Sequence, residues 1–582
     1  MSIEPLITEH LDIWTAADTE KKSGRGRSSG SSGNVYGIKK LRELILELAV
    51  RGKLVPQDAS DEPASELLKR IAAEKAKLVA EGTIKKSKPL EPIANDEKPF
   101  ELPVGWEWAK LGEITNFGIT EKLSFISDET WVLDLEDIEK DTSRLLNKHR
   151  FCDRRSLSDK NSFLEGDVLY GKLRPYLNKV IVADESGVCT TEILPIRCYG
   201  SFSSHYFKYA LKSPHFINYV NARSYGMKMP RLGTEDGRKA NFPLPPLAEQ
   251  HRIVAKVDEL MALCDQLENQ HNNAAEAHEK LVTHLLGTLT QSQNAEDFNT
   301  NWHRISEHFD TLFTTEASID ALKQTLLQLA VMGKLVPQDP NDEPASELLK
   351  RIQAEKAKLI AEGKIKKDKP LAEITDEEKP FELPVGWEWV RKNEVFAFLN
   401  GYAFKSEWFE SSGIKLLRNV NVSHGKANWS DPAYISIEQA ANFNEYMLNV
   451  DDLVLSLDRP IITTGLKYAI ISKADIPCLL LQRIAKVSSF CKVVNSEYLA
   501  IWLNSLFFVG NIDPGRSNGV PHISTTQVAN MCFALPPTAE QWRIVAKVDE
   551  LIAICDQLKS QIISANQLQQ KLADVMTQGA DC

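Results

Sequence analysis

The strongest constraint on this chain is an internal repeat of long, nearly identical segments. GKLVPQD at 52–58 recurs at 333–339, and ELPVGWEW at 101–108 recurs at 382–389. Both pairs have the same separation, so the two copies align without a gap. Across 51–108, about 46 of 58 positions are identical to the later copy, far above any accident of composition. We call this segment block A.

A second repeated segment, block B, follows each block A at a distance. Residues 244–267 and 535–558 match at about 20 of 24 positions. The stretches between the blocks, 109–243 and 390–534, differ strongly from each other. A frame that stays alike around inserts that diverge predicts interchangeable modules that recognise two different things.

Block B is predicted to be a long helix. Pro245 and Pro246 precede it, as prolines do at helix starts. Apolar residues then alternate four and three apart, which is the heptad spacing of a coiled coil. A helix of ~40 residues is ~60 Å long, which suits a spacer, and two such stripes are expected to pack on each other. The predicted seam consists of Ile253, Val257, Leu260, Cys264 and Leu267, and in the second copy of Ile544, Val548, Leu551, Cys555 and Leu558.

Block A is predicted to contain two shorter helices. The first carries an apolar face around 41–48 and ends at Gly52, the usual glycine at a helix C-terminus. The second begins near Pro63 and ends at Gly82, with alternating Lys and Glu on its surface. The Pro- and Lys-rich stretch 84–99 is expected to be an extended linker. The tryptophans of GWEW belong to the constant frame, so we expect them to anchor the module by packing.

The two ends of the chain suggest a nearly circular arrangement. The central block B leads into the block A helix at 319–331, whereas the final block B stops at Cys582. Joining the termini would complete the second copy, so a pseudo-two-fold axis is expected. The predicted segments are a flexible leader (1–36), block A (37–100), the first module (101–243), the central spacer helix (244–286), an insert (287–315), the second block A (316–381), the second module (382–534) and the distal spacer helix (535–582).

Length and composition limit the number of domains and the class of protein. The 582 residues are 43% apolar and 26% charged, which predicts several domains of an ordinary soluble protein. No apolar run approaches the ~20 residues of a membrane span, and the N-terminus lacks the pattern of a signal peptide. Nine cysteines without a CxxC pair and scattered histidines indicate neither disulfides nor a metal site. A cytoplasmic protein without a membrane association is expected.

The net charge of −11 argues against a nucleic-acid partner until it is divided by segment. Residues 109–243 carry about 20 Lys and Arg against 18 Asp and Glu, and residues 390–534 about 13 against 12. The two modules are therefore the cationic part of an anionic protein, which is the bias that phosphate contact requires.

The modules also share a skeleton despite their low similarity. In each, an aspartate is followed by two apolar residues, four others and Arg-Pro: Asp167 leads to Arg174, and Asp452 leads to Arg459. Short β-branched runs mixed with helical ones predict α/β modules of similar fold. The shared arginines have a common role, either in DNA contact or in an ion pair with the shared aspartates.

Several side chains of the modules have the chemistry for contact with DNA. Arg and Lys can bind phosphates or the acceptors of guanine. The candidates are Lys172, Arg174, Tyr176, Lys179, Arg223, Lys228, Arg231, Arg459, Arg516 and His522.

No catalytic motif accompanies these candidates. The sequence contains no Asp/Asn-Pro-Pro-aromatic tetrad of an amino-methyltransferase and no GxxxxGK[ST] nucleotide loop. Acid-plus-Lys spacings that loosely resemble a nuclease site occur only where surface charge explains them. We expect no catalytic residue and no metal site in this chain.

The LPPxAEQxRIVAKVDEL motif, present twice, and LAVxGKLVPQD resemble the specificity subunit of type I restriction-modification systems, from about Tyr36 onward. The long block A resembles the branch called type IB. The resemblance implies an α+β protein with two α/β target-recognition domains, separated by long antiparallel coiled-coil helices, related by a pseudo-two-fold internal repeat.

The resemblance implies that the chain acts together with DNA and with other protein subunits. Each module would read one half of a split, asymmetric sequence in double-stranded DNA, and the helices would set the spacing. The frame would bind two methyltransferase (M) subunits, and restriction/translocase (R) subunits would join them. This chain would hold no cofactor, while S-adenosylmethionine, ATP and Mg would act on the partner subunits.

Three other functions compete with this one. A stand-alone DNA-binding regulator would bind its site tightly as an isolated chain. A metal-dependent nuclease would cleave DNA when a divalent ion is present. A coiled-coil scaffold would not depend on Arg174 or Arg459 at all.

Overall fold

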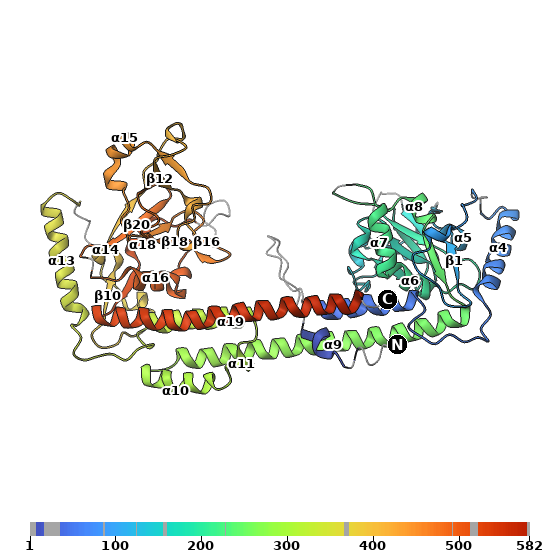
Figure 1. The fold of residues 1–582 in the computed structure, drawn as a ribbon, viewed down its shortest axis with the longest axis horizontal. Coiled ribbons are helices and arrows are strands. Elements are labelled where there is room, and N and C mark those ends of the chain that lie inside the picture. Colours follow the sequence, from blue (N-terminus) through green and yellow to red (C-terminus); the bar gives the residue numbers. More distant parts are fainter. Residues whose placement is uncertain are drawn as a thin grey trace. The chain divides into compact units, whose positions relative to one another are not determined.

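A computed structural model describes the chain as two compact units. Unit 1 comprises residues 1–274 together with 565–582, and unit 2 comprises 275–564. Each unit holds one module on the first half of a long helix, α9 in unit 1 and α19 in unit 2 (Figure 1). The structure describes residues 7, 9–16, 35–84, 88–123, 125–154, 160–226, 228–365, 372–491, 493–512 and 522–578.

Unit 1 contains a helical frame and a module with two main sheets. The sheet orders are β3-β2-β7-β4 and β6-β5-β8, and β1 pairs with β9 where the module joins the frame. The helices are α2 (Leu11–Ala16), α3 (Tyr36–Val50), α4 (Ala64–Ala80), α5 (Leu111–Ile114), α6 (Ser204–Lys212), α7 (Pro214–Arg223), α8 (Thr234–Arg238) and the start of α9 (Leu247–Thr290). The strands are β1 (Glu107–Lys110), β2 (Trp131–Leu133), β3 (His149–Arg150), β4 (Lys160–Phe163), β5 (Val168–Gly171), β6 (Val180–Val182), β7 (Gly187–Thr190), β8 (Ile193–Ile196) and β9 (Asn241–Leu244).

Unit 2 repeats this plan with different strands. Its sheets have the orders β11-β20-β15-β18-β13, β14-β12-β19 and β16-β17, and β10 pairs with β21 at the frame. The helices are α10 (Ala295–Ser306), α11 (Phe309–Leu312), α12 (Glu316–Val331), α13 (Ala345–Ala361), α14 (Lys392–Val395), α15 (Ile437–Ala440), α16 (Ser496–Asn504), α17 (Leu506–Val509), α18 (Thr525–Asn530) and α19 (Thr538–Gln578). The strands are β10 (Glu388–Arg391), β11 (Phe396–Asn400), β12 (Ile414–Leu417), β13 (His424–Gly425), β14 (Ala433–Ile435), β15 (Leu453–Ser456), β16 (Ile461–Ile462), β17 (Gly465–Leu466), β18 (Tyr468–Ile470), β19 (Cys478–Leu480), β20 (Ile484–Ser489) and β21 (Cys532–Leu535).

The glycine after each first frame helix joins the two repeated motifs. Gly52 and Gly333 both have φ +68°, the left-handed conformation that ends a helix. A Cβ atom on Gly52 would lie 2.4 Å from Cγ of Pro103 and 3.0 Å from Cζ2 of Trp106. GKLVPQD and ELPVGWEW are therefore two sides of one contact, which explains why they recur together.

The predicted seam of block B lies inside the two cores. All its residues are buried except the last of each set, which is half-buried. Within each unit, the seam shares its core with the first block A helix, a partner that the sequence analysis did not assign. Arg42 of α3 donates to Asp265 and Glu268 of α9 at 2.7 Å each, and Lys559 of α19 lies 2.7 Å from Asp320 of α12.

The start of the chain departs from the expectation of a flexible leader. Residues 11–16 form α2, whose Trp14 is fully buried in the core of unit 1. A Cβ on Gly37 would lie 2.3 Å from the carbonyl oxygen of Trp14, so α2 packs directly on the first turn of α3. Residues 17–34, with the Gly- and Ser-rich stretch, lie outside the described part of the chain.

The end of the chain returns to the same place. Asp574, near the end of α19, accepts a hydrogen bond from the Tyr36 hydroxyl at 2.7 Å and lies 3.4 Å from Nζ of Lys40. Ala573 is buried in the core of unit 1. The distal block B therefore meets the first block A helix, as the nearly circular arrangement requires.

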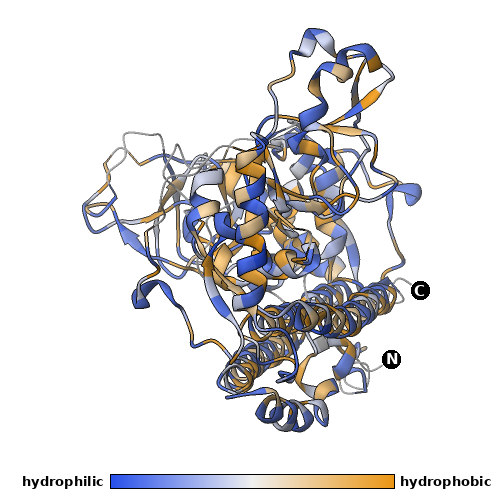
Figure 2. Cartoon of the chain, turned by 90° about the vertical axis from the view of Figure 1, so that its left-hand side faces the viewer, coloured by the Kyte–Doolittle hydropathy of each residue, from blue (hydrophilic) through white to orange (hydrophobic). Residues whose placement is uncertain are grey.

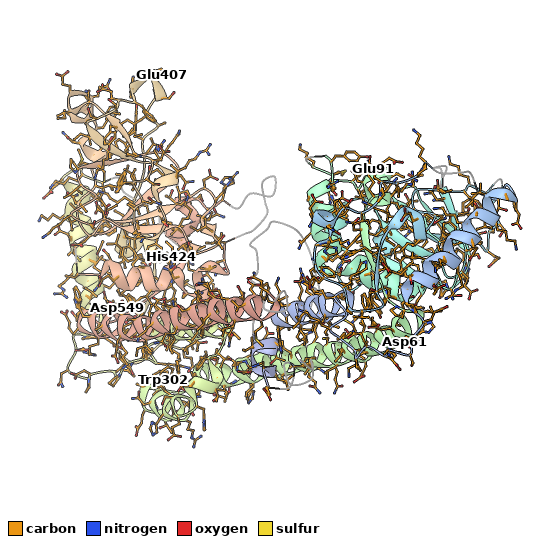
Figure 3. The ribbon with its side chains drawn as sticks, turned by 45° about the vertical axis from the view of Figure 1, so that its right-hand side comes forward. Asp61, Glu91, Trp302, Glu407, His424 and Asp549 are labelled. Atoms are coloured by element: carbon orange, nitrogen blue, oxygen red, sulfur yellow. The ribbon has the colours of Figure 1, made fainter. Side chains whose placement is uncertain are left out.

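The insert after the central block B is a helical cover for unit 2. Helix α9 continues to Thr290, and α10 and α11 follow it. Phe298 and Trp302 of α10 stack on each other, with ring centroids 5.9 Å apart, and pack on the core (Figure 3).

The mixture of short β-branched strands and helices predicted for the modules is confirmed. The β-branched runs at 180–182, 453–457 and 468–471 contain β6, β15 and β18. Helical segments predicted between such strands correspond to α6 and α16.

A buried glutamate locks each module to its spacer helix. Glu249 of α9 accepts hydrogen bonds from the indole of Trp106 at 2.9 Å and from Gln57 at 3.2 Å. Glu540 of α19 accepts the equivalent pair from Trp387 at 2.9 Å and from Gln338 at 3.0 Å. The first tryptophan of GWEW therefore has the packing role expected for it.

The glutamine after each glutamate completes this lock. Gln250 accepts a hydrogen bond from the backbone N–H of Ser203, the residue before α6, at 3.0 Å. Gln541 does the same for Asn495 before α16, at 2.9 Å. An ion pair between Arg252 and Asp61 (2.6 Å; Figure 3) ties α9 to block A. The Ala-Glu-Gln of each block B is thus explained by its contacts.

Stability should depend on pH through the two locking glutamates. Burial raises the pKa of Glu249 and of Glu540, although each accepts hydrogen bonds that lower it. The folded chain therefore binds these protons more tightly than the unfolded chain does, and their contribution is lost as the pH rises through the folded pKa values. We expect Glu249→Gln and Glu540→Gln to remove this dependence of the free energy of unfolding on pH.

The measurement is the free energy of unfolding by urea from pH 4 to 7. As the pH rises, the free energy of unfolding of each variant should increase relative to that of the parent. A pH-independent difference would contradict the assignment.

Helices of both units alternate polar and apolar residues along their length (Figure 2). In the part of the chain that the structure describes, none of them is long and apolar enough to cross a membrane.

Candidate nucleic-acid interface

The first module presents Arg174 at the end of strand β5. The strand pairs with β6 and β8, and residues 172–175 turn out of the sheet; we call this turn the arginine corner. The backbone of Lys172 accepts from Leu232, and the backbone N–H of Arg174 donates to Pro230 at 2.7 Å. A returning segment therefore holds the corner in place.

The second module builds the same corner from different residues. Strand β15 pairs with β18 and β20, and residues 457–460 follow it. The backbone of Leu457 accepts from Ile523 at 3.0 Å, as that of Lys172 accepts from Leu232 at 3.1 Å. The segments that contain Leu232 and Ile523 therefore occupy the same place in the two modules.

Both corner arginines have strained backbones. Arg174 and Arg459 each have φ 50°, in the left-handed region that few residues other than glycine adopt. Each also precedes a proline, which disfavours helical conformations of the residue before it. Such strain costs about 1–3 kcal/mol and is concentrated at functional sites. The same strained arginine in two dissimilar modules indicates a role beyond folding.

The alternative role of these arginines, an ion pair with the shared aspartates, is wrong. Asp167 accepts two hydrogen bonds from Arg197, at 2.9 and 3.1 Å. Asp452 lies 3.5 Å from Nζ of Lys486. Neither Arg174 nor Arg459 forms an ion pair with any described residue, and Nε of Arg174 is buried without a hydrogen-bond partner among them.

Charged residues that the sequence analysis missed surround each corner. In the first module, Glu192 accepts from Nε and Nη2 of Arg231 at 3.1 and 3.0 Å. In the second, Asp458 accepts from Arg483 at 2.8 Å and lies 3.1 Å from Nδ1 of His522. No motif marks Glu192 or Arg483, because only the pairing of the strands brings them to the corner, whereas Asp458 directly precedes Arg459.

Other candidates divide between the corner and the rest of the module. Tyr176 follows the first corner and is exposed, and Lys228 is exposed on the loop that leads to Arg231. Arg223 lies over the ring of Tyr219 at the end of α7. It lines a cavity of about 630 Å³ that none of the corner residues lines.

Lys179 and Arg516 do not join this set. Nζ of Lys179 donates to the carbonyl of Leu135 at 2.7 Å, and burial lowers the pKa of this lysine, so its side chain serves the fold. Arg516 lies outside the described residues.

The arrangement suits the binding of an anion. Each corner offers one guanidinium that is unpaired among the described residues and a second one that a carboxylate orients. Among the described residues, no cluster of His, Cys, Asp and Glu could hold a metal ion.

The chain thus carries two modules on one repeated frame, each with an arginine corner suited to an anion. Residues 103–277 and 384–567 each match the family described as type I restriction modification DNA specificity domain. The chain belongs to this family.

Curated relatives agree over the full length. The chain is 53% identical to the type I restriction enzyme EcoAI specificity subunit of Escherichia coli, and 41% identical to the EcoEI specificity subunit of the same organism. Each alignment covers 100% of both proteins.

A solved structure shows the same fold. It is described as the structural basis underlying complex assembly and conformational transition of the type I R-M system, with a TM-score of 0.53 and 19% identity. The match covers 83% of this chain and 99% of that chain.

Proposed function

We propose that this chain is the DNA-reading subunit of a type I restriction-modification complex. Each module reads one half of a split DNA target, and the helices of the frame set the spacing between the halves. The observation that carries this proposal is the arginine corner, which two dissimilar modules build at the same place with strained, unpaired arginines. Family membership supports it.

Catalysis then belongs to partner subunits. Two methyltransferase subunits, using S-adenosylmethionine, would modify adenine, and restriction/translocase subunits would use ATP and Mg to cut unmodified DNA. The repeat supports two copies of one partner, because it presents the same frame surface twice. The long block A supports a type IB-like complex.

The test is to map methylated adenines in a host genome with and without this chain, in the presence of its methyltransferase partner. A split, asymmetric consensus that appears only with the chain is the expected result. Methylation at a continuous site, or none at all, would refute the proposal.

The repeated frame surface also predicts where the partner binds. Val104 and Val385 are 97% and 96% exposed at the same position of ELPVGWEW in both copies, so neither contributes to its own core. We expect Val104→Glu with Val385→Glu to abolish co-purification of the methyltransferase subunits, and either change alone to remove one of two. Ile437→Glu, at an exposed apolar residue of the second module, is the control. Undiminished capture by the double variant would exclude this surface.

A further inference from the structure

The two corners correspond residue by residue, although their sequences do not. The backbone N–H of Lys172 donates to Glu192 at 3.0 Å, and that of Leu457 donates to Arg483 at 2.9 Å. Because β5 and β15 are followed by these same bonds, Glu192 and Arg483 occupy one position in the two modules. The sequence around them, TTEILPI and LLQRIAK, gives no sign of this.

Two further positions correspond in the same way. An isolated antiparallel bridge joins Leu173 to Arg231 in the first module, and another joins Asp458 to His522 in the second. Leu173 and Asp458 therefore share a position, and so do Arg231 and His522. Together with 192 and 483, these define three variable positions around each constant arginine.

The two modules place different charges at these three positions, and at one of them the charge is reversed, from Glu192 to Arg483. The carboxylate stands at Glu192 in the first module and at Asp458 in the second. The guanidinium that it orients moves as well, from Arg231 to Arg483. Each module therefore keeps one carboxylate–guanidinium pair but builds it from different positions.

The constant arginines and the variable positions of the corner are suited to different roles. A residue that is the same in modules with different targets cannot distinguish those targets, so Arg174 and Arg459 suit a contact that all DNA offers, the phosphate backbone. The variable positions are where discrimination can reside. A carboxylate that forms an ion pair with one side of a guanidinium fixes the direction of the guanidinium's remaining donors. This favours recognition of a planar pair of acceptors.

We infer that Arg231 and Arg483 are specificity-determining residues, each of which reads a guanine in the half-site of its own module. Guanine presents two acceptors, N7 and O6, on its major-groove edge, and the guanidinium is the group that binds both. The Arg483 side chain is 65% exposed and its Nη1 donates to Asp458, while its other side-chain donors bind no described residue. This inference rests on the proposed function, because it assigns the bases that the proposed subunit reads.

The test uses the complete complex with its methyltransferase subunits. Parent, Arg231→Gln and Arg483→Gln complexes are compared by mapping methylated sites genome-wide in a host that lacks the system. Arg483→Gln should weaken the preference for one guanine in one half-site roughly ten- to hundredfold and leave the other half-site unchanged. Arg231→Gln should do the same in the opposite half-site.

The control is Arg351→Gln, on helix α13 of the frame, which removes another exposed arginine paired with a carboxylate, Glu343. It should leave the consensus unchanged. Co-purification with the methyltransferase checks that each variant folds. If Arg483→Gln fails this check, Arg483→Lys replaces it, because lysine keeps the charge but not the paired donors.

The outcomes distinguish failure of the proposed function from failure of the inference about Arg231 and Arg483. A parent complex that yields no split consensus refutes the proposed function. A parent with a split consensus, and variants that leave it intact or relax both halves together, overturns the inference while the proposed function stands.

Discussion

Replacement of Trp387 by alanine is expected to lower the free energy of unfolding of unit 2 by about 3–5 kcal/mol, the range for large-to-small changes of buried aromatic residues. The indole is buried, lies edge-on to Tyr498 with ring centroids 6.4 Å apart, and donates to Glu540 at 2.9 Å. The change would leave a cavity and would remove one of the two described donors of the buried carboxylate, since only Gln338 would remain. Urea unfolding, followed by circular dichroism, measures the effect.

Trp542 provides a matched control in the same unit. Its side chain is 60% exposed on α19, so Trp542→Ala should change the free energy of unfolding by no more than about 0.5 kcal/mol. Trp106→Ala, the equivalent of Trp387→Ala, should destabilise unit 1 instead. Equal effects of Trp387→Ala and Trp542→Ala would show that the lock is not what holds the module.

The combined variant Arg174→Asn with Arg459→Asn is expected to bind target DNA about a hundredfold more weakly in the assembled complex. The estimate takes about 1.4 kcal/mol per lost charged contact, at the low end for charge-assisted hydrogen bonds. Asparagine tolerates the left-handed backbone of both corners, so the change removes the charge without adding strain.

The dependence of affinity on salt gives an independent measurement. If each arginine neutralises one phosphate, the slope of log K against log salt should fall by about 0.9 per variant, or about 1.8 for the pair. Arg351→Asn should leave both affinity and slope unchanged. A loss of affinity with an unchanged slope would contradict a phosphate contact at the corners.

The frame could be predicted well from the sequence because its contacts lie within repeated motifs. The helix after Pro63, the glycine at 52 and the apolar stripe from Ile253 follow local rules of capping and periodicity. These rules act over a few residues, so one copy sufficed to find them and the second copy confirmed them.

The surroundings of the corners could not be predicted in the same way. Arg174 and Arg459 were found because a short skeleton recurs, whereas Glu192 and Arg483 reach the corner only through strand pairing across the module. Which residue faces which in a sheet depends on register, and register is set by the whole module. For the same reason, the sequence could not decide the partner of Asp167, which is Arg197 and not Arg174.

The leader was misjudged for a different reason. Its Gly- and Ser-rich stretch dominates the composition and hides the apolar residues of the short helix before it. Trp14 is fully buried and Ile13 packs against the same core, and burial of these side chains outweighs the weak helix propensity of six residues.

The return of α19 to unit 1 has a consequence for the order in which the protein is completed during synthesis. All of unit 2 is a continuous stretch of chain, so it can close before translation ends. The core of unit 1 includes Ala573, which is synthesised after the whole of unit 2. The unit whose synthesis begins first is therefore completed second, and a stop between residues 564 and 573 would damage the first module rather than the second.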